Sequence, residues 1–332
     1  MSKKIKMDKD VLLEVRGLKK YFPVREGLLL RAKAQNKAVD DVSFTIKNGE
    51  TLGLVGESGC GKSTLGKCVV RLYDTTEGQI GFEGKEIAHL RASKLKETRR
   101  HIQMIFQDPV ESLNSRHTVG EIIEEPLKVQ KIGTDASRKK RVAELLEIVG
   151  LPARSASRYP FEFSGGQRQR IGIARSIALN PKLVVCDEPV SALDVSIQSQ
   201  ILNLMNDLQK EFGLSYLFIA HDLAVVKHIA DRIAVMYLGR IVEIGDGEEL
   251  YQKKRHPYTK ALIDAIPVPD PRRRTEMKGL EGDVPSPINP PSGCAFHPRC
   301  PFAQDICKTE RPELREMGGK GMSHQVACHF DL

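Results

Sequence analysis

The stretch that decides the fold reads Gly56-Glu57-Ser58-Gly59-Cys60-Gly61-Lys62-Ser63-Thr64 and fits the pattern G-x-x-x-x-G-K-[ST] of a phosphate-binding P-loop. It follows an apolar run at residues 51–55, which predicts a buried strand, and it precedes helical spacing over residues 62–72. Glycines let backbone N–H groups curl around phosphate oxygens, and the start of the next helix adds the positive end of its dipole. We expect Lys62 to reach the β- and γ-phosphates of a nucleotide and the Ser63 hydroxyl to bind Mg²⁺. The remaining members of the expected cradle are Gly56, Ser58, Gly59, Cys60, Gly61 and Thr64.

Two adjacent carboxylates follow another apolar run, at residues 183–186. Asp187 and Glu188 would lie at the carboxyl edge of a parallel sheet, where open α/β folds bind ligands. We expect Asp187 to hold the magnesium shell and Glu188 to orient and deprotonate an attacking water, as phosphoryl transfer requires. An Asp-Glu pair at a strand end is weak evidence by itself, but together with the P-loop it indicates hydrolysis of a nucleoside triphosphate.

The order of elements along the chain predicts an α/β fold with a parallel sheet and two additions. Strand-like alternation occurs at residues 11–15 and 42–46, helices without strands occupy residues 118–159, and the α/β rhythm resumes from residue 183 to about residue 245. A helical pair at about 247–265 precedes a proline-dense segment and a separate small module. We therefore expect a nucleotide-binding domain at residues 1–265, with a helical subdomain at about 110–175, and a linker plus module at residues 266–332.

The bulk composition limits the possible functions. The chain has 332 residues, 40% hydrophobic and 28% charged, which is typical of a folded globular protein, and its net charge is +8. The basic runs at residues 138–141, 253–255 and 272–274 lack interleaved aromatic residues, so we expect no nucleic-acid partner. No stretch approaches the roughly 20 apolar residues that a membrane-spanning helix needs, and the amino-terminal residues show no secretory signal.

A third motif distinguishes one family of P-loop proteins from the others. Phe163-Ser164-Gly165-Gly166-Gln167 resembles the signature sequence of ABC ATPases, with phenylalanine where leucine is commonest. Read alone, this motif could be a helix N-cap at Ser164 without any ligand. The other elements of the ABC family appear in the right order around it: Gln107 as the Q-loop glutamine, residues 191–194 with Asp194 as the D-loop, His221 as the switch histidine, and Phe22, or its neighbour Tyr21, as the aromatic residue that stacks on adenine.

The resemblance covers about residues 11–265 and implies a P-loop NTPase with a RecA-like core, an antiparallel β subdomain and a helical ABC subdomain. It implies catalytic roles for Glu188, His221, Gln107 and Lys62, with Gln107 also near Mg²⁺. It further implies a head-to-tail dimer in which ATP on one subunit is covered by Ser164, Gly165, Gly166, Gln167 and the D-loop Asp194 of the other. Each subunit would then be an ATPase only as part of a pair.

Further residues are similar to the peptide-importer branch, the oligopeptide and dipeptide permease ATPases, and to the F-type subunit in particular. These are residues 108–114 after the Q-loop, residues 194–198, His256-Pro257-Tyr258-Thr259 and the extended segment at residues 22–37. The resemblance implies a second, paralogous ATPase subunit, two transmembrane permease subunits, an extracytoplasmic peptide-binding protein contacted indirectly, and a peripheral position on the cytoplasmic face of the inner membrane. The branch also contains importers of nickel and other small solutes. A soluble ABC ATPase and an exporter ATPase remain alternatives.

The last four cysteines stand apart from the other three. Cys60, Cys68 and Cys186 fall in the expected core as ordinary buried thiols, whereas Cys294, Cys300, Cys307 and Cys328 form a C-x5-C-x6-C-x20-C pattern in a segment too short to build much core. A reducing compartment disfavours disulfides, which leaves zinc, an iron–sulfur cluster or unligated thiols. In the resembling ATPases this pattern is associated with a [4Fe–4S] cluster, and Zn²⁺ is the alternative.

Overall fold

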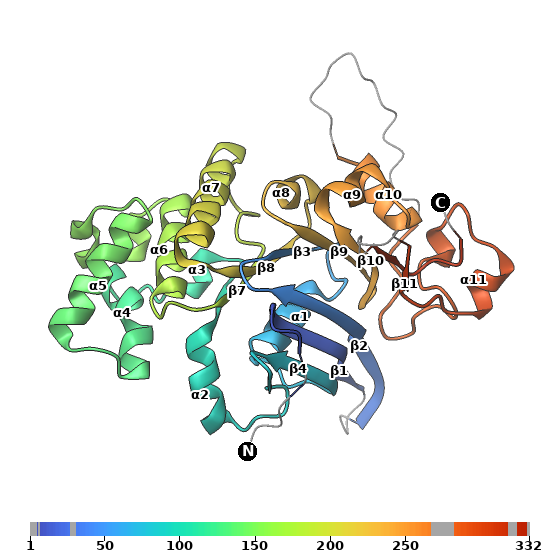
Figure 1. Ribbon diagram of the computed structural model, residues 1–332, viewed down its shortest axis with the longest axis horizontal. Helices are drawn as coiled ribbons and strands as arrows, with labels where there is room; N and C mark the ends of the chain where they lie inside the picture. The colour runs from blue at the N-terminus through green and yellow to red at the C-terminus, as the bar shows by residue number, and fades with distance from the viewer. Residues whose placement is uncertain (1–4, 6, 27–30, 267–281, 318–323, 331–332) are drawn as a thin grey trace, which may run out of the picture.

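Two sheets form the centre of the molecule in the structure, a computed structural model that describes residues 5, 7–26, 31–266, 282–317 and 324–330 (Figure 1). The smaller sheet has the strand order β2-β1-β4-β5 and is antiparallel. Its strands are β1 (Val11–Glu26), β2 (Arg31–Lys47), β4 (Glu77–Phe82) and β5 (Lys85–Glu86). β1 is much longer than the run at residues 11–15 predicted, because it continues as one arm of a hairpin with β2.

The larger sheet has eight strands in the order β11-β12-β10-β9-β3-β8-β7-β6. From β9 to β6 the neighbours are parallel, and β10, β12 and β11 are antiparallel additions at one edge. The strands are β3 (Thr51–Val55), β6 (Ile102–Ile105), β7 (Leu183–Asp187), β8 (Ser215–Ala220), β9 (Arg232–Tyr237), β10 (Arg240–Asp246), β11 (Arg315–Glu316) and β12 (Gln325–Val326). β3, β7 and β8 are buried throughout, as expected of central parallel strands. The predicted α/β, P-loop type of fold is therefore present.

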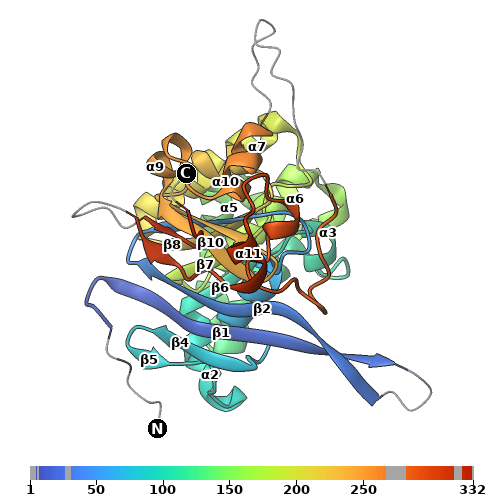
Figure 2. The ribbon, with the colours of Figure 1, turned by 90° about the vertical axis from the view of Figure 1, so that its right-hand side faces the viewer.

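Helices surround the larger sheet, and Figure 2 shows the smaller sheet as a separate layer. α1 begins directly after the P-loop and contacts strands of both sheets, so it lies where the two layers meet. The helices outside the insertion described next are α1 (Lys62–Val69), α2 (Ala92–His101), α7 (Val195–Phe212), α8 (Leu223–Lys227), α9 (Gly247–Gln252), α10 (Pro257–Asp264) and α11 (Asp305–Thr309).

Every element between β6 and β7 is helical, and this region forms one end of the molecule in Figure 1. α4 and α5 both begin with a capping box, in which a threonine side chain accepts from the third helical N–H and the third side chain returns a bond. The helices are α3 (Pro109–Ser112), α4 (Val119–Gln130), α5 (Asp135–Ile148) and α6 (Gly165–Ile177), with 3-10 turns at Ala153–Ser157 and Pro160–Glu162.

The carboxyl-terminal region is attached differently from the separate module that the sequence suggested. β12 pairs with β10, and β11 pairs with β12, so this region extends the main sheet. Phe296 is 1% exposed and belongs to the same hydrophobic core as the central strands. Burial against the larger domain replaces the independent core that so short a segment cannot build. The prolines at positions 267, 269 and 271 lie outside the described residues.

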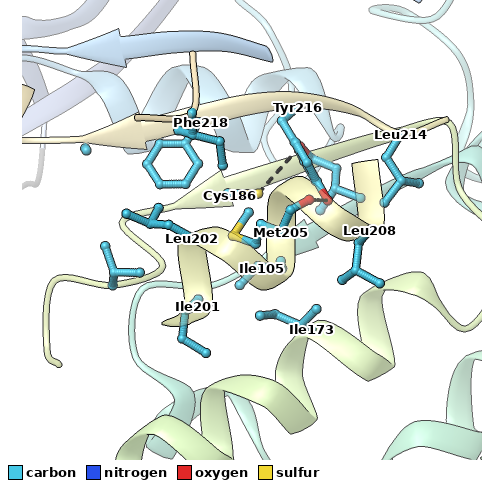
Figure 3. Packing of buried hydrophobic residues seen from close by; sticks show 14 of the residues in the cluster. Ile105, Ile173, Cys186, Ile201, Leu202, Met205, Leu208, Leu214, Tyr216 and Phe218 are labelled. Carbon is cyan, nitrogen blue, oxygen red and sulfur yellow. Dashed lines mark hydrogen bonds between the residues drawn. The ribbon is translucent and has the colours of Figure 1, made fainter. Parts of the chain in front are cut away.

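The core on one face of the larger sheet packs α7 against β7 and β8 (Figure 3). Met205 and Leu208 of α7 belong to one buried cluster with Cys186 and Phe218 of the strands. The Tyr216 hydroxyl donates to the Met205 carbonyl oxygen at 3.1 Å (Figure 3). The buried hydroxyl thus has a partner, which offsets its desolvation. This packing holds the carboxyl end of β7, where Asp187 and Glu188 lie, in a defined position.

Within the described residues, none of the helices combines the length and the apolar character needed to cross a bilayer.

Candidate functional site: a nucleotide pocket at the carboxyl edge of the parallel strands

The P-loop joins β3 to α1, and its glycines are required by close contacts with the surrounding chain. Gly56 has φ +154° and Gly61 has φ +107°. A Cβ on Gly56 would lie 2.2 Å from the Met236 carbonyl oxygen, and one on Gly61 would lie 2.0 Å from the Ala38 carbonyl oxygen. Both distances are far inside van der Waals contact, so only glycine allows the loop to pack between β9 and β2.

Lys62 is 4% exposed and its ammonium group lies inside the curl of the loop. Its Nζ donates to the Gly56 carbonyl oxygen at 2.7 Å and to the Glu57 carbonyl oxygen at 3.0 Å, and it lies 3.8 Å from the Cys60 Sγ. A buried ammonium needs such acceptors. Phosphate oxygens entering the loop would offer stronger, charged acceptors to the same group.

Ser63 and Asp187, which the sequence predicts to bind Mg²⁺, lie in direct contact. The Ser63 Oγ donates to Asp187 Oδ1 at 2.7 Å across 124 residues of sequence. Burial raises the pKa of Asp187, and the hydrogen bond from Ser63 opposes that rise. A hydroxyl and a carboxylate side by side provide oxygen ligands of the kind that Mg²⁺ prefers.

Glu188 lies between the two other polar residues that the family resemblance selected. Its Oε2 accepts from Gln107 Nε2 at 3.1 Å and is 3.1 Å from His221 Nδ1. Glu188 has φ 46°, a left-handed backbone conformation that is uncommon outside glycine, and its N–H donates to the Ile219 carbonyl oxygen at 3.0 Å. Backbone strain of this kind concentrates at functional sites. Three strand ends, those of β6, β7 and β8, thus bring three polar side chains to one point.

These residues surround a hollow of about 510 Å³. That size suits a nucleotide, because small-molecule sites are typically about 300–1,000 Å³. The lining residues are Phe22, Asn36, Ala38, Ser58, Gly59, Gly61, Lys62, Ser63, Thr64, Gln107, Glu188, His221 and Pro287.

Three lining residues were not predicted from the sequence: Asn36, Ala38 and Pro287. Asn36 and Ala38 carry no motif and reach the hollow because β2 passes beside the P-loop. Pro287 comes from the carboxyl-terminal region, and its carbonyl oxygen accepts from the Lys37 N–H at 3.2 Å. The only signal in the sequence was a proline-dense segment, which gives no indication of where it docks.

Of the two aromatic candidates for the adenine contact, Phe22 lines the hollow. Its ring packs edge-on against Tyr73, with centroids 5.6 Å apart. The Tyr21 hydroxyl instead donates to Asp40 Oδ1 at 2.5 Å, and Asp40 also accepts from Arg240. Tyr21 is therefore committed to a buried polar network.

The signature residues do not line this hollow. Ser164 caps α6: its Oγ accepts from the Gln167 N–H at 3.4 Å, and Gln167 Oε1 accepts from the Ser164 N–H at 3.0 Å. Gly166 packs close to Ile197, at the start of α7, so the signature lies beside the D-loop. Ser164, Gly165, Gln167 and Asp194 are exposed. Within this single chain the motif is a capped helix start facing solvent.

The cysteine predictions have mixed outcomes. Cys60, Cys68 and Cys186 are buried free thiols. Of the P-loop residues predicted to bind phosphate, Gly56 and Cys60 do not line the hollow. The described part of the chain contains no group of three or more His, Cys, Asp or Glu side chains that could hold a metal ion, so the structure does not support the expected cluster. One small cavity is nevertheless lined by the remaining four free thiols, Cys294, Cys300, Cys307 and Cys328.

Comparisons with known proteins agree with this geometry. Residues 39–191 match the family model described as ABC transporter, and residues 242–307 match the model described as oligopeptide/dipeptide transporter, C-terminal region. The chain is 55% identical to the oligopeptide transport ATP-binding protein AppF of Bacillus subtilis, over 97% of this chain and 98% of the relative. It is 53% identical to the oligopeptide transport ATP-binding protein OppF of Haemophilus influenzae, over 97% of each.

Among solved structures, the chain is similar to the dimeric ATP-binding cassette MJ0796 in a post-hydrolysis state with ADP and Pi bound. The TM-score is 0.63 at 29% identity, and the match covers 71% of this chain and 98% of that cassette.

Proposed function

Because the chain belongs to the family of oligopeptide-transport ATP-binding proteins of ABC transporters, we propose that it hydrolyses ATP to drive uptake of oligopeptides or dipeptides through a membrane transporter. The observation that carries this proposal is the Glu188 carboxylate, held by Gln107 and His221 at the edge of the hollow that contains the P-loop.

The side chains divide the chemistry between them. Lys62 and the P-loop N–H groups bind the phosphates, and Phe22 supplies a ring for the base. Glu188 accepts the proton of the water that attacks the γ-phosphorus, while His221 and Gln107 keep that carboxylate in place. Ser63 and Asp187, with Gln107 nearby, fit Mg²⁺. The ion would neutralise phosphate charge there.

Two variants test this site. Glu188→Gln keeps the shape and removes the base, so ATP binding should stay within about twofold while hydrolysis falls by about 100-fold or more. Lys62→Ala removes a phosphate-facing charge and should abolish measurable ATP binding. Normal turnover in Glu188→Gln would rule out the base assignment, and normal binding in Lys62→Ala would rule out the P-loop assignment.

The active unit is a head-to-tail pair, in which Ser164, Gly165, Gly166 and Gln167 of one subunit cover the ATP of the other. The position of the signature outside the chain's own hollow supports this arrangement, as does the dimeric state of the similar cassette. The partner is a paralogous ATPase, and the pair binds two permease subunits on the cytoplasmic face of the inner membrane and receives peptide indirectly from an extracytoplasmic binding protein. Glu188→Gln, mixed with the partner ATPase and ATP, should elute as a dimer in gel filtration. A persistent monomer in the same mixture would contradict the arrangement.

The cargo is a peptide rather than nickel or another small solute. Transport by the reconstituted complex, measured with labelled peptide and with Ni²⁺, distinguishes the two. Co-purification with ribosomes in place of permease subunits would indicate a soluble ABC ATPase instead.

The four carboxyl-terminal cysteines hold a [4Fe–4S] cluster, with Zn²⁺ as the alternative. The proposal rests on the donor set, since such clusters take four thiolates. The four thiols line one small cavity, but within the described residues they do not form a group that could hold a metal ion as they stand. Burial raises the pKa of Cys294 to about 11, so this thiol stays protonated unless a metal binds. Iron and acid-labile sulfide near four per chain, in protein purified without oxygen, would support the cluster; zinc or no metal would rule it out.

A further inference from the structure

The P-loop is bound from outside by an arginine of the carboxyl-terminal region. Arg299 Nη1 donates to Glu57 Oε2 at 2.7 Å and Arg299 Nη2 donates to Glu57 Oε1 at 3.0 Å, across 242 residues of sequence. The Arg299 side chain is 5% exposed and that of Glu57 is 27% exposed. Paired, parallel N–H···O bonds of this kind give both strength and a defined orientation.

Glu57 is held at its backbone as well. Its N–H donates to the Tyr258 hydroxyl oxygen at 2.8 Å, and its carbonyl oxygen accepts from Lys62 Nζ at 3.0 Å. Every polar group of this one residue therefore has a partner. Two of the partners, Arg299 and Tyr258, come from elements after β10, outside the parallel core that carries the catalytic motifs.

Arg299 is itself held in position by aromatic packing. It ends the 3-10 turn His297–Arg299, and its guanidinium lies 6.0 Å from the Tyr237 ring centroid. The Phe296 ring lies 5.2 Å from that of Tyr237 and 5.4 Å from that of Tyr258. The same buried aromatic cluster thus supports both of the groups that bind Glu57, and it leaves the guanidinium little freedom.

We propose that Arg299 is a positioning residue for ATP binding, which acts through Glu57 to hold the first half of the P-loop in its phosphate-binding shape. The inference rests on the proposed nucleotide site and goes beyond it, because it makes the carboxyl-terminal region a working part of that site. A loop that is already held in its binding conformation loses less conformational entropy when the ligand binds. Arg299 does not line the hollow, so its loss should weaken ATP binding and leave turnover at saturating ATP nearly unchanged.

A double-mutant cycle on the full-length chain tests this mechanism. We expect Arg299→Ala and Glu57→Ala each to raise the Kd for ATP by about tenfold, a change within the usual range for coupled contacts. The double variant should be no worse than about twofold beyond either single variant, because both remove the same contact. KM in the ATPase assay should rise with Kd, while kcat stays within about twofold.

Arg299→Lys and a matched control sharpen the experiment. Lysine keeps the charge but loses the fork geometry, so Arg299→Lys should fall between the wild type and Arg299→Ala. Arg232→Ala breaks a comparable ion pair, with Glu50 at 3.0 Å, at the other end of the parallel strands, and should leave Kd unchanged.

Three results would overturn the inference: an unchanged Kd in Glu57→Ala, independent effects that multiply in the double variant, or a fall in kcat with no change in KM. The Glu57 variant keeps the test decisive if Arg299→Ala fails to fold. If Lys62→Ala abolishes binding and Glu57→Ala does not weaken it, the positioning role alone is wrong. If Lys62→Ala binds normally, the proposed nucleotide site is wrong and the positioning role falls with it.

Discussion

The P-loop and the signature are both glycine-containing turns that open a helix, but their glycines are needed for different reasons. Gly61 has φ +107°, and a Cβ there would lie 2.0 Å from the Ala38 carbonyl oxygen. Gly165 has no positive φ, and its Cβ would meet only Leu193 Cδ2, at 3.5 Å, an ordinary contact. The chain's own fold therefore demands glycine at position 61 of the P-loop and does not demand it at position 165 of the signature. The next signature residue differs, because a Cβ on Gly166 would lie 2.6 Å from Ile197 Cγ2 of the same chain. A requirement for Gly165 must come from something outside this chain, and the proposed partner subunit supplies it.

The largest effect should come from Gly61→Ala, which tests the first half of the comparison. The methyl group both clashes with backbone and forces a strained φ, so we expect a loss of about 3 kcal/mol in the free energy of unfolding and no measurable ATP binding. Denaturant unfolding and equilibrium binding check this. Gly49→Ala is the control for strain alone, because Gly49 has φ +75° and open space around its Cβ; a loss as large there would show that the Ala38 contact is irrelevant.

The second half of the comparison is tested by Ser164→Asp. Aspartate caps a helix as well as serine, so stability should be kept, whereas its charge would face the phosphates bound to the partner. We expect ATP turnover of the assembled pair to fall by about 100-fold. Thr118→Asp makes the same change at the capped start of α4 and should leave turnover within about twofold. Normal turnover in Ser164→Asp would mean that Ser164 caps α6 and has no role at the partner's nucleotide.

Titration of His256, the buried N-cap residue of α10, adds a pH dependence. Burial lowers the pKa of His256 to about 4, and its Nδ1 accepts from the Tyr258 N–H at 3.1 Å. In the unfolded chain His256 becomes protonated below about pH 6.5, whereas in the folded chain it stays neutral down to about pH 4. Stability should thus fall as the pH drops through this window, by about 3 kcal/mol.

The variant His256→Asn keeps an N-cap and removes the titration. Unfolding free energies measured from pH 7 to pH 4 should show a smaller loss in this variant than in the wild type. Parallel curves for the two proteins would mean that His256 does not titrate as described.

The smallest effect distinguishes Gly165 from its neighbours in the same helix. Gly165→Ala should leave stability unchanged or raise it by up to about 1 kcal/mol, since alanine favours helix, and should lower turnover of the pair by about tenfold. Gly172→Ala is the matched control in α6, because nothing lies within 4 Å of its Cβ. Equal turnover in the two variants would contradict the inference that Gly165 is required by the partner subunit.

Much of the nucleotide site could be predicted from the sequence because each motif lies at the end of a buried strand. Gln107, Glu188 and His221 follow β6, β7 and β8, and adjacent parallel strands bring their carboxyl ends together. The family resemblance was still needed to select Gln107 and His221, since one glutamine or histidine after a strand carries little information. Ser63 and Asp187 were likewise expected only to share a magnesium shell, and the structure shows a direct hydrogen bond between them.

Contacts made by the carboxyl-terminal region could not be predicted. Pro287 reaches the hollow and Arg299 reaches Glu57 through pairings across more than 200 residues, and no local periodicity encodes such docking. The cysteine spacing suggested a self-contained module. It gave no hint that β12 would pair with β10, because a two-residue strand has no measurable alternation.

The pairing of β12 with β10 also bears on the order of events during synthesis. β12 begins at Gln325, 79 residues after the end of β10 at Asp246, and the buried His324 beside it donates from Nε2 to Glu243 Oε1 at 2.7 Å. While the chain is still on the ribosome, β10 is therefore an open edge and Glu243 lacks its histidine. Chains that end early retain an unpaired strand edge, which is a site for aggregation and for recognition by chaperones and proteases. The edge of β10 is thus closed only after β12 itself has been synthesised.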